Sequence, residues 1–282
     1  MKAVVFAGQG SQRRGMGAAL FEELPYLTAR AEEVLGWSVR ELCVSGSDHD
    51  LARTEYTQPA LYVVQALAWL SRLERGSELP RFAAGHSLGE YAALFAAGVF
   101  DFETGLALVK RRGELMGRAA GGAMAAVVGL PVEEVERVLA SSHELGIEIA
   151  NLNSPRQVVL AGTPDALERA RAPFEHAGAQ WVRLAVGAAF HSSHMESAAR
   201  EFAAALHAIT MRPPRFPVLS NLTARPHEHD PRPALAAQIR ATVRWTECVE
   251  HLVAQGVTEF EELGEGKVLT GLLRQIRRGQ PS

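Results

Sequence analysis

Apolar positions along the chain follow two periods, and their alternation predicts a sheet covered by helices. A β-rich run from Lys2 to Ala7 ends in a glycine turn, and apolar residues at helical spacing follow it. The segment 58–73 is apolar almost all round, as a helix buried in a core is. A second short strand ends at Ala84 and gives way to a helix over about 88–97. This order predicts an α/β fold whose mostly parallel sheet is covered on both faces.

The pattern changes between residues 121 and 187. Strand, helix, strand, strand, helix and strand patterns follow one another there, with Pro131 opening the first helix and Thr163 capping the second. The β-α-β-β-α-β order is that of a split βαβ unit. We therefore predict a small subdomain over residues 121–187, inserted into a larger domain formed by residues 1–120 and 188–282.

Composition and charge argue against several classes of protein. With 282 residues, 47% of them hydrophobic and 22% charged, the chain has enough apolar side chains for a large core. A formal net charge of -3 predicts no general attraction to nucleic acid or membrane surfaces. The two cysteines, Cys43 and Cys248, predict neither a disulfide framework nor a zinc site, which fits a reducing cytoplasm. The apolar run at the N-terminus is too short for a secretory signal or a membrane span.

The pentapeptide G-x-S-x-G at residues 85–89 is the strongest chemical signal. It stands where a strand is expected to become a helix, and this context is what a nucleophile elbow requires. The flanking glycines remove side chains that would clash, so a strained turn can lift the Ser87 hydroxyl into a cleft. The main-chain N–H of Leu88, at the start of the helix, would then donate to a developing oxyanion. The alternative is a glycine-rich turn whose serine only caps the helix.

A serine hydroxyl needs a base, and His191 is the best placed of the ten histidines. It lies in a loop of small residues that returns from the small subdomain to the large one. His194 is the competing candidate, and either could be an ordinary surface histidine. His86 adjoins the serine, but neighbouring side chains in a tight turn point apart, so we expect it to pack or to start the helix. The run HEHD at residues 227–230 is expected to be a solvated loop rather than a metal site.

Arg112 falls within the apolar arc of the helix expected over residues 102–119. An arginine in that position needs an anionic partner, because an unpaired charge is rarely buried. Its guanidinium fork suits a carboxylate. Two alternatives follow, a carboxylate of a bound ligand and a core acid of the protein itself.

Six segments occur in an order that resembles one family of enzymes. They are FAGQGSQ, GHSLGEYAAL, KRRG, ANLNSPRQVVLAG, GAAFHSSHM and GKVLTGL. Together they resemble the malonyl-CoA:acyl-carrier-protein transacylases and the related acyltransferases of polyketide synthases, from about residue 4 to residue 276. The resemblance implies an α/β-hydrolase-like large domain with a parallel sheet and an inserted ferredoxin-like small subdomain.

The resemblance also implies a role for each matching residue. Ser87 would be the nucleophile that becomes malonylated, and His191 the general base of a Ser-His dyad. The main-chain N–H groups of Gln9 and Leu88 would form the oxyanion hole. The main-chain oxygen of Gln238 would orient the histidine in place of a triad aspartate.

Two further residues bear on the acyl group. Arg112 would hold the free carboxylate of the malonyl group. Phe190, in an AFH signature of malonyl-selective relatives, would exclude an α-methyl branch, although one methylene usually discriminates only about 10- to 200-fold. An acyl hydrolase on the same scaffold is the main alternative, but such enzymes replace the carboxylate-binding arginine. A lipase-like esterase would place its histidine later in the chain than His191, and a non-catalytic docking module would need none of these residues.

The reaction implied is ping-pong transfer of a malonyl group from malonyl-CoA to the phosphopantetheine thiol of an acyl carrier protein. No metal or redox cofactor is expected, since the CoA thioester is a substrate. Without a carrier or ketosynthase segment, the chain is expected to be a discrete, trans-acting, cytoplasmic monomer serving fatty acid or polyketide synthesis. Acidic carrier proteins favour a basic rim, for which Arg274, Arg277 and Arg278 are candidates, unless they only complement a helix end.

Overall fold

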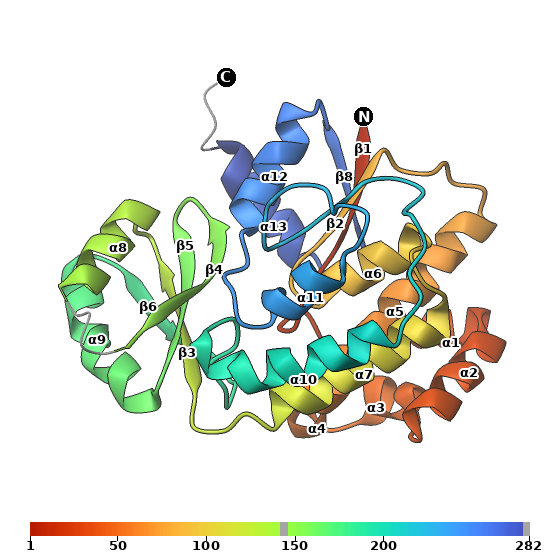
Figure 1. Ribbon diagram of the computed structural model, residues 1–282, viewed down its shortest axis with the longest axis horizontal. Coiled ribbons are helices and arrows are strands. Elements are labelled where there is room, and N and C mark those ends of the chain that lie inside the picture. The colour runs from red at the N-terminus through yellow and green to blue at the C-terminus, as the bar shows by residue number, and fades with distance from the viewer. Residues whose placement is uncertain (142–145, 279–282) are drawn as a thin grey trace.

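The computed structural model of the chain describes residues 1–141 and 146–278, and the larger sheet in it is parallel. Its strands stand in the order β7-β2-β1-β8, and each runs parallel to its neighbours (Figure 1). They are β1 (Lys2–Phe6), β2 (Phe82–Gly85), β7 (Val218–Leu219) and β8 (Glu259–Leu263). The predicted α/β fold with a parallel sheet is confirmed.

Alternate residues of β1 pack on opposite faces of this sheet, which is why the strand is apolar throughout. Val4 and Phe6 belong to the larger core, whereas Ala3 and Val5 belong to the core on the other face. Helices cover both faces (Figure 1). The larger core includes residues of α5 (Thr54–Glu74), α6 (Gly89–Ala96), α7 (Phe102–Gly117) and α10 (Glu196–His207), and the smaller one residues of α12 (Trp245–Ala254) and α13 (Val268–Arg278).

The long helix α5 is buried along most of its length, as its apolar sequence predicts. It begins at Thr54, a few residues before the apolar run, and packs most extensively against α7. Four short helices lead into it from β1: α1 (Ala18–Glu23), α2 (Pro25–Leu35), α3 (Val39–Ser45) and α4 (Asp48–Ala52). Among the helices of the described segments, none combines the length and the apolarity that crossing a bilayer needs.

The second sheet is antiparallel, with the strand order β4-β5-β3-β6. Its strands are β3 (Ala123–Val128), β4 (Glu148–Ser154), β5 (Gln157–Gly162) and β6 (Gln180–Arg183), and α8 (Val132–Ala140) and α9 (Pro164–His176) pack on it around a core of its own. This is the split βαβ arrangement, so the expected ferredoxin-like unit is confirmed. All of these elements lie within residues 121–187, and the domain limits themselves stay a prediction.

The small sheet joins the large domain along β4, beside the site described below. Asn151 pairs with Val243 through an isolated parallel bridge, and the Leu152 N–H donates to the Val243 oxygen at 2.9 Å. The Ser154 hydroxyl donates to the side chain of Gln275, on α13, at 2.7 Å. The edge of the small sheet is thereby covered by the large domain.

Candidate active site

Ser87 stands at a sharp turn between β2 and α6, as the elbow interpretation requires. Its φ is 51°, in the left-handed region that a serine adopts at a cost of about 1–3 kcal/mol. A Cβ atom on Gly85 would lie 1.9 Å from the carbonyl carbon of Gly89, and one on Gly89 would lie 2.0 Å from the oxygen of Phe6. The turn therefore closes only because both flanking positions lack a side chain.

The strained turn is braced by Asn221. This residue lies just after the end of β7, the strand that pairs with β2. Its Oδ1 accepts a hydrogen bond from the Ser87 N–H at 2.6 Å, and its Nδ2 donates to the Gly85 oxygen at 2.8 Å. Asn221 is fully buried, so these bonds are not shared with solvent. The sequence analysis missed this residue. The available signal was its place directly after a parallel strand, because the carboxyl ends of such strands meet at one edge of a sheet.

His191 contacts the serine through a tautomer that its surroundings fix. Its Nε2 lies 2.7 Å from Ser87 Oγ, and its Nδ1 lies 2.8 Å from the main-chain oxygen of Gln238. A carbonyl oxygen can only accept, so Nδ1 carries the proton and Nε2 is left to accept the serine proton. Burial, reinforced by the positive charge of Arg112, lowers the pKa of His191 to about 3. The ring is therefore neutral at pH 7, the state in which it can act as a base.

The end of α11 (Arg232–Gln238) bonds to the main chain of both Ser87 and His191. The His191 N–H donates to the oxygen of Ile239 at 3.1 Å, while Nε2 of Gln238 donates to the oxygen of Ser87 at 3.0 Å. His191 has a φ of 58°, so it shares the left-handed conformation of Ser87. Strained conformations of this kind persist only where surrounding contacts over-determine them.

Arg112 is completely buried on α7 and reaches the serine. Its Nη2 donates to Ser87 Oγ at 3.0 Å and to Gln238 Oε1 at 2.9 Å, and its Nη1 donates to Gln58 Oε1 at 2.7 Å. Within the described residues Nε has no partner, and no carboxylate bonds to this guanidinium. Among the described residues, Arg112 therefore forms no ion pair with a core acid. Its hydrogen-bond partners are all neutral groups.

These side chains meet in a cleft between the two sheets, with a cavity volume of about 90 Å³. The main-chain N–H groups of Gln9 and Leu88 donate to no other group in the part of the chain that the structure describes. Free donors at this place are what an oxyanion hole requires. The loop that carries Gln9 lies against the elbow, since a Cβ on Gly8 would lie 2.6 Å from the oxygen of His86. The walls include Gln9, Leu88 and Phe190 from the large domain and Met124, Asn151 and Leu184 from the segment 121–187.

Residues 3–275 match the family model described as acyl transferase domain. This chain belongs to the acyl transferase domain family. Among curated proteins, the polyketide biosynthesis malonyl CoA-acyl carrier protein transacylase PksC of Bacillus subtilis (strain 168) is 47% identical over 281 residues, which are 99% of this chain and 98% of PksC. The polyketide biosynthesis protein PksE of the same organism is 48% identical over 280 residues, 98% of this chain, but the chain spans only 36% of PksE.

Solved structures agree with this assignment. A crystal structure of malonyl CoA-acyl carrier protein transacylase from Burkholderia pseudomallei matches with a TM-score of 0.97 and 48% identity, covering 100% of this chain and 99% of that one. A malonyl-transacylase solved in complex with a type II polyketide synthase acyl-carrier protein matches with a TM-score of 0.94 and 40% identity, covering 98% of this chain and 93% of that one. The predicted family and two-sheet fold of the acyl transferase domain are thus confirmed.

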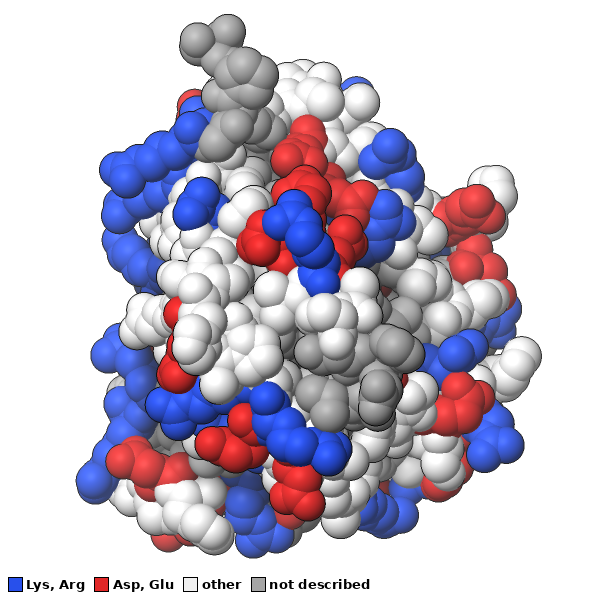
Figure 2. Space-filling view, turned by 90° about the vertical axis from the view of Figure 1, so that its left-hand side faces the viewer, with Lys and Arg blue, Asp and Glu red and all other residues white. Residues whose placement is uncertain are grey.

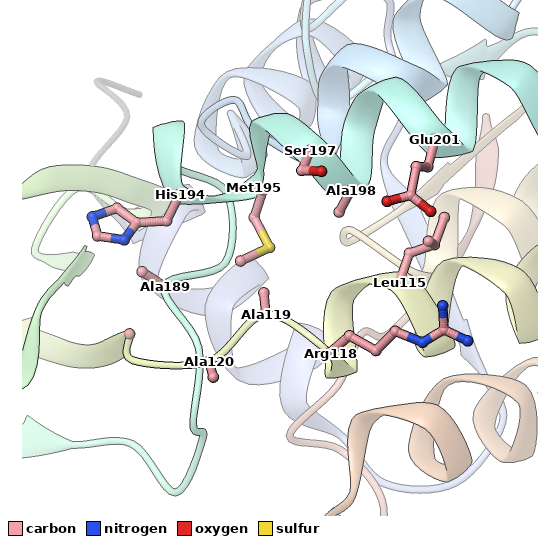
Figure 3. Close-up of a pocket in the computed structure, with 11 residues that line it drawn as sticks. Leu115, Arg118, Ala119, Ala120, Ala189, His194, Met195, Ser197, Ala198 and Glu201 are labelled. Carbon is pink, nitrogen blue, oxygen red and sulfur yellow. The ribbon is translucent and has the colours of Figure 1, made fainter.

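Two other histidines of the acyl transferase domain do not contact the serine hydroxyl. His194 is exposed and lines a second pocket, between the end of α7 and α10, where Figure 3 shows it apart from Arg118 and Glu201. The Nε2 of His86 lies 2.8 Å from Oδ1 of Asn153, and its ring packs 5.7 Å from that of Trp245. Of the candidate bases, His191 is the one that reaches Ser87.

The expectation of a solvated loop at residues 227–230 is wrong for its first residue. His229 and Asp230 are exposed, but the side chain of His227 is only 3% exposed. The turn after β7 brings the chain back to the sheet, where the His227 N–H donates to the oxygen of Val218 at 2.8 Å. Its ring is then buried against Glu90 of α6, with Nε2 2.7 Å from Oε1. The described residues hold no group of His, Cys, Asp and Glu suited to a metal ion.

Glu90 and Gln58 were also missed by the sequence analysis. A glutamate in the first turn of a helix is ordinarily a surface residue that complements the helix dipole, yet Glu90 is 0% exposed. Gln58 is one of two buried glutamines on the apolar helix α5, and the sequence gives no sign of which group its amide contacts. Both were recognisable only as polar residues inside segments otherwise apolar enough to be buried.

Proposed function

We propose that this acyl transferase domain moves a malonyl group from malonyl-CoA to the phosphopantetheine thiol of an acyl carrier protein, through a malonyl ester of Ser87. The observation that carries the proposal is Arg112, a buried cation that contacts the nucleophile and has no acidic partner. A site for acyl groups without a second carboxylate would leave this buried guanidinium with no carboxylate bonded to it, because the buried Glu90 acts on it only from a distance, through the amide of Gln238. The names of PksC and of the solved relatives as malonyl transacylases support the same substrate.

In the first half-reaction, Ser87 Oγ attacks the thioester carbonyl while its proton passes to Nε2 of His191. The Nδ1–H group of His191 stays hydrogen-bonded to the main-chain oxygen of Gln238, and this bond stabilises the imidazolium that forms. The N–H groups of Gln9 and Leu88 donate to the oxyanion of the tetrahedral intermediate. When the intermediate collapses, the C–S bond breaks and the CoA thiolate takes the proton from His191.

The second half-reaction reverses these steps with another thiol. The phosphopantetheine thiol gives its proton to His191 and attacks the ester carbonyl. The C–O bond to Ser87 then breaks, and Oγ recovers the proton from the imidazolium. Bonds and protons balance over the two halves, so the scheme calls for no metal or redox group.

Arg112 and Phe190 would select the acyl group. The guanidinium fork can hold the free carboxylate of malonyl with two parallel hydrogen bonds, and Nη2 is the atom that already reaches the nucleophile. Phe190, 7% exposed, lines the same cleft. Its ring would occupy the space that an α-methyl branch needs.

The carrier protein is proposed to dock on the rim beside α13. Arg274, Arg277 and Arg278 are exposed there, and α13 contacts β4, whose Asn151 lines the cleft. Figure 2 shows Lys and Arg side chains gathered along the left-hand edge of the face that carries the small sheet. Acidic carriers would be drawn to such an edge. Action as a cytoplasmic monomer stays a prediction.

Intact-protein mass spectrometry tests the proposed function. Incubation with malonyl-CoA should add one malonyl group, on the peptide that bears Ser87, and Ser87→Ala should add none. The loaded enzyme should pass the group to a holo carrier protein but not to the apo form, which lacks the phosphopantetheine thiol. A loaded enzyme that releases free malonate faster than it transfers would instead favour the acyl hydrolase.

A further inference from the structure

The buried pair of Glu90 and His227 lies one contact away from the proposed machinery. Oε1 of Glu90 and Nε2 of His227 share a hydrogen bond of 2.7 Å. Oε2 accepts from the Asn221 N–H at 2.9 Å and from Nε2 of Gln238 at 2.8 Å. The Asn221 N–H and the Gln238 amide nitrogen can only donate, so Oε2 accepts both of these bonds. A carboxylate that is 0% exposed is tolerated because all of these bonds are made.

This carboxylate fixes the side-chain amide of Gln238 in one orientation. The amide nitrogen donates to Glu90 and to the main-chain oxygen of Ser87, and both of these partners can only accept. The amide oxygen must therefore face the other way, where it accepts from Nη2 of Arg112 at 2.9 Å. A flipped amide would set its NH₂ group against a guanidinium, which has no acceptor. Glu90 is thus one of the two acceptors that hold the amide with its oxygen toward Arg112.

We propose that Glu90 and His227 are positioning residues: by fixing the amide of Gln238, they hold the guanidinium of Arg112 where it meets the carboxylate of the acyl group. His227 supplies the bond to the second oxygen of Glu90, and without it a buried carboxylate oxygen would be left unpaired. The same carboxylate holds the main chain of Asn221, which braces the elbow. The inference rests on the proposed function, because the group that Arg112 receives is the malonyl carboxylate.

A competition within one sample tests the inference. The wild type, His227→Phe and Glu90→Gln are each mixed with equal concentrations of malonyl-CoA and acetyl-CoA, and the two acyl-enzymes are quantified by mass spectrometry at short times. Their ratio is independent of the fraction of folded protein, since the same molecules form both. We expect malonyl over acetyl to fall roughly ten- to hundredfold in both variants, because a misplaced Arg112 affects only the acyl group with a carboxylate.

Two substitutions in the same loop serve as matched controls. His227→Gln keeps an N–H donor and should recover most of the wild-type ratio. His229→Gln changes an exposed histidine two residues away and should leave the ratio unchanged. A lower ratio in His227→Phe or in Glu90→Gln supports the inference. The inference is overturned if His227→Phe and Glu90→Gln both keep the wild-type ratio of malonyl to acetyl loading, including the case in which loading by the two acyl groups falls equally.

Failure of the inference can be told apart from failure of the proposed function. A wild type that forms a malonyl ester on Ser87, with variants that keep its selectivity, refutes only the role of Glu90 and His227. A wild type that forms no malonyl ester refutes the transferase itself, and with it the basis of the inference.

Discussion

Nη2 of Arg112 lies 3.0 Å from Oγ of Ser87, so the cation and the proposed nucleophile share a hydrogen bond. The serine oxygen meanwhile lies 2.7 Å from Nε2 of His191, which is placed to take its proton. A carboxylate held by the guanidinium is thereby brought close to the attacking oxygen. In the proposed function, one side chain would couple recognition of the acyl group to its transfer, which makes Arg112 the most informative position to change.

Arg112→Ala should lose malonyl loading selectively. Without the guanidinium, the free carboxylate would enter a buried cleft unpaired, so we expect the rate of malonyl loading to fall about a hundredfold or more. Loading by acetyl-CoA, which brings no carboxylate, should change far less. The rate of malonyl loading of Arg112→Lys should lie between those of the wild type and Arg112→Ala, because an ammonium keeps the positive charge but lacks the planar fork of donors. Rates of acyl-enzyme formation by quenched-flow mass spectrometry measure all three.

The adjacent residue offers a matched control for this experiment. Arg111 is half-buried and pairs with Glu114 of the same helix and with Glu201 of α10. Arg111→Ala removes an equal charge and should leave malonyl selectivity unchanged. If Arg112→Ala kept the wild-type preference for malonyl-CoA, the proposed substrate would be wrong.

What the sequence predicted well were features that depend on short spacings. The elbow around Ser87 is visible because its two glycines and its strand-to-helix context lie within one short segment. The burial of Arg112 follows from the period of a single helix. The small subdomain was recognisable because its four strands and two helices follow one another in the chain.

What the sequence did not predict were contacts between distant segments. Asn221 meets Ser87 across 134 residues, and His227 meets Glu90 across 137. No local period encodes such pairs, because they depend on how β7 and the loop after it are placed beside β2. His227 was misjudged for this reason: flanking prolines describe its loop, whereas its burial depends on the sheet on which the loop folds back.

Activity should not titrate near the ordinary pKa of histidine. The pKa of His191 is lowered to about 3, first by burial and then by Arg112. We therefore expect kcat/KM for malonyl transfer to stay level from pH 8 down to about 5.5. In Arg112→Ala one cause of the lowering is removed, so the acid limb, followed with acetyl-CoA, should move to higher pH. A wild-type acid limb centred near pH 6.5 would contradict this account of the base.

The same buried imidazole should make the fold less stable in acid. The unfolded chain takes up a proton below about pH 6.5, whereas folded His191 does not, so its stabilising contribution is lost as the pH falls from about 6.5 toward 3. Between pH 7.5 and 5.5 the free energy of unfolding should drop by about 1.4 kcal/mol from this group. Urea unfolding of the wild type and of His191→Asn measures the difference. Equal losses in the two proteins would show that His191 is not the group responsible.

Gly89→Ala should disrupt the elbow. The new Cβ would lie 2.0 Å from the oxygen of Phe6, and β1 cannot move away because strands pair with it on both sides. We expect a loss of about 3 kcal/mol or more in stability, together with loss of acyl-enzyme formation. Gly271→Ala, in α13, is the control: nothing lies within 4 Å of its Cβ, so it should stabilise the protein by up to about 1 kcal/mol. Thermal unfolding compares the two, and similar melting temperatures would contradict the steric argument.

Phe190→Ser should admit a branched acyl group. The ring lines the cleft that also contains Ser87 and Arg112, and replacing it with a hydroxymethyl group frees space next to the acyl chain. We expect loading by methylmalonyl-CoA to rise relative to malonyl-CoA by about 10- to 200-fold, the range over which one methylene is discriminated. His194→Ser, at an exposed position in the short 3-10 helix that follows (Ser193–Met195), should leave the ratio unchanged. Because Arg112 is proposed to bind the carboxylate common to both substrates, the Phe190 variant should alter only the tolerance for the branch, and acetyl-CoA should remain a poor donor. A rise in acetyl loading instead would mean that Phe190 helps to hold the carboxylate in place, not that it excludes the methyl group.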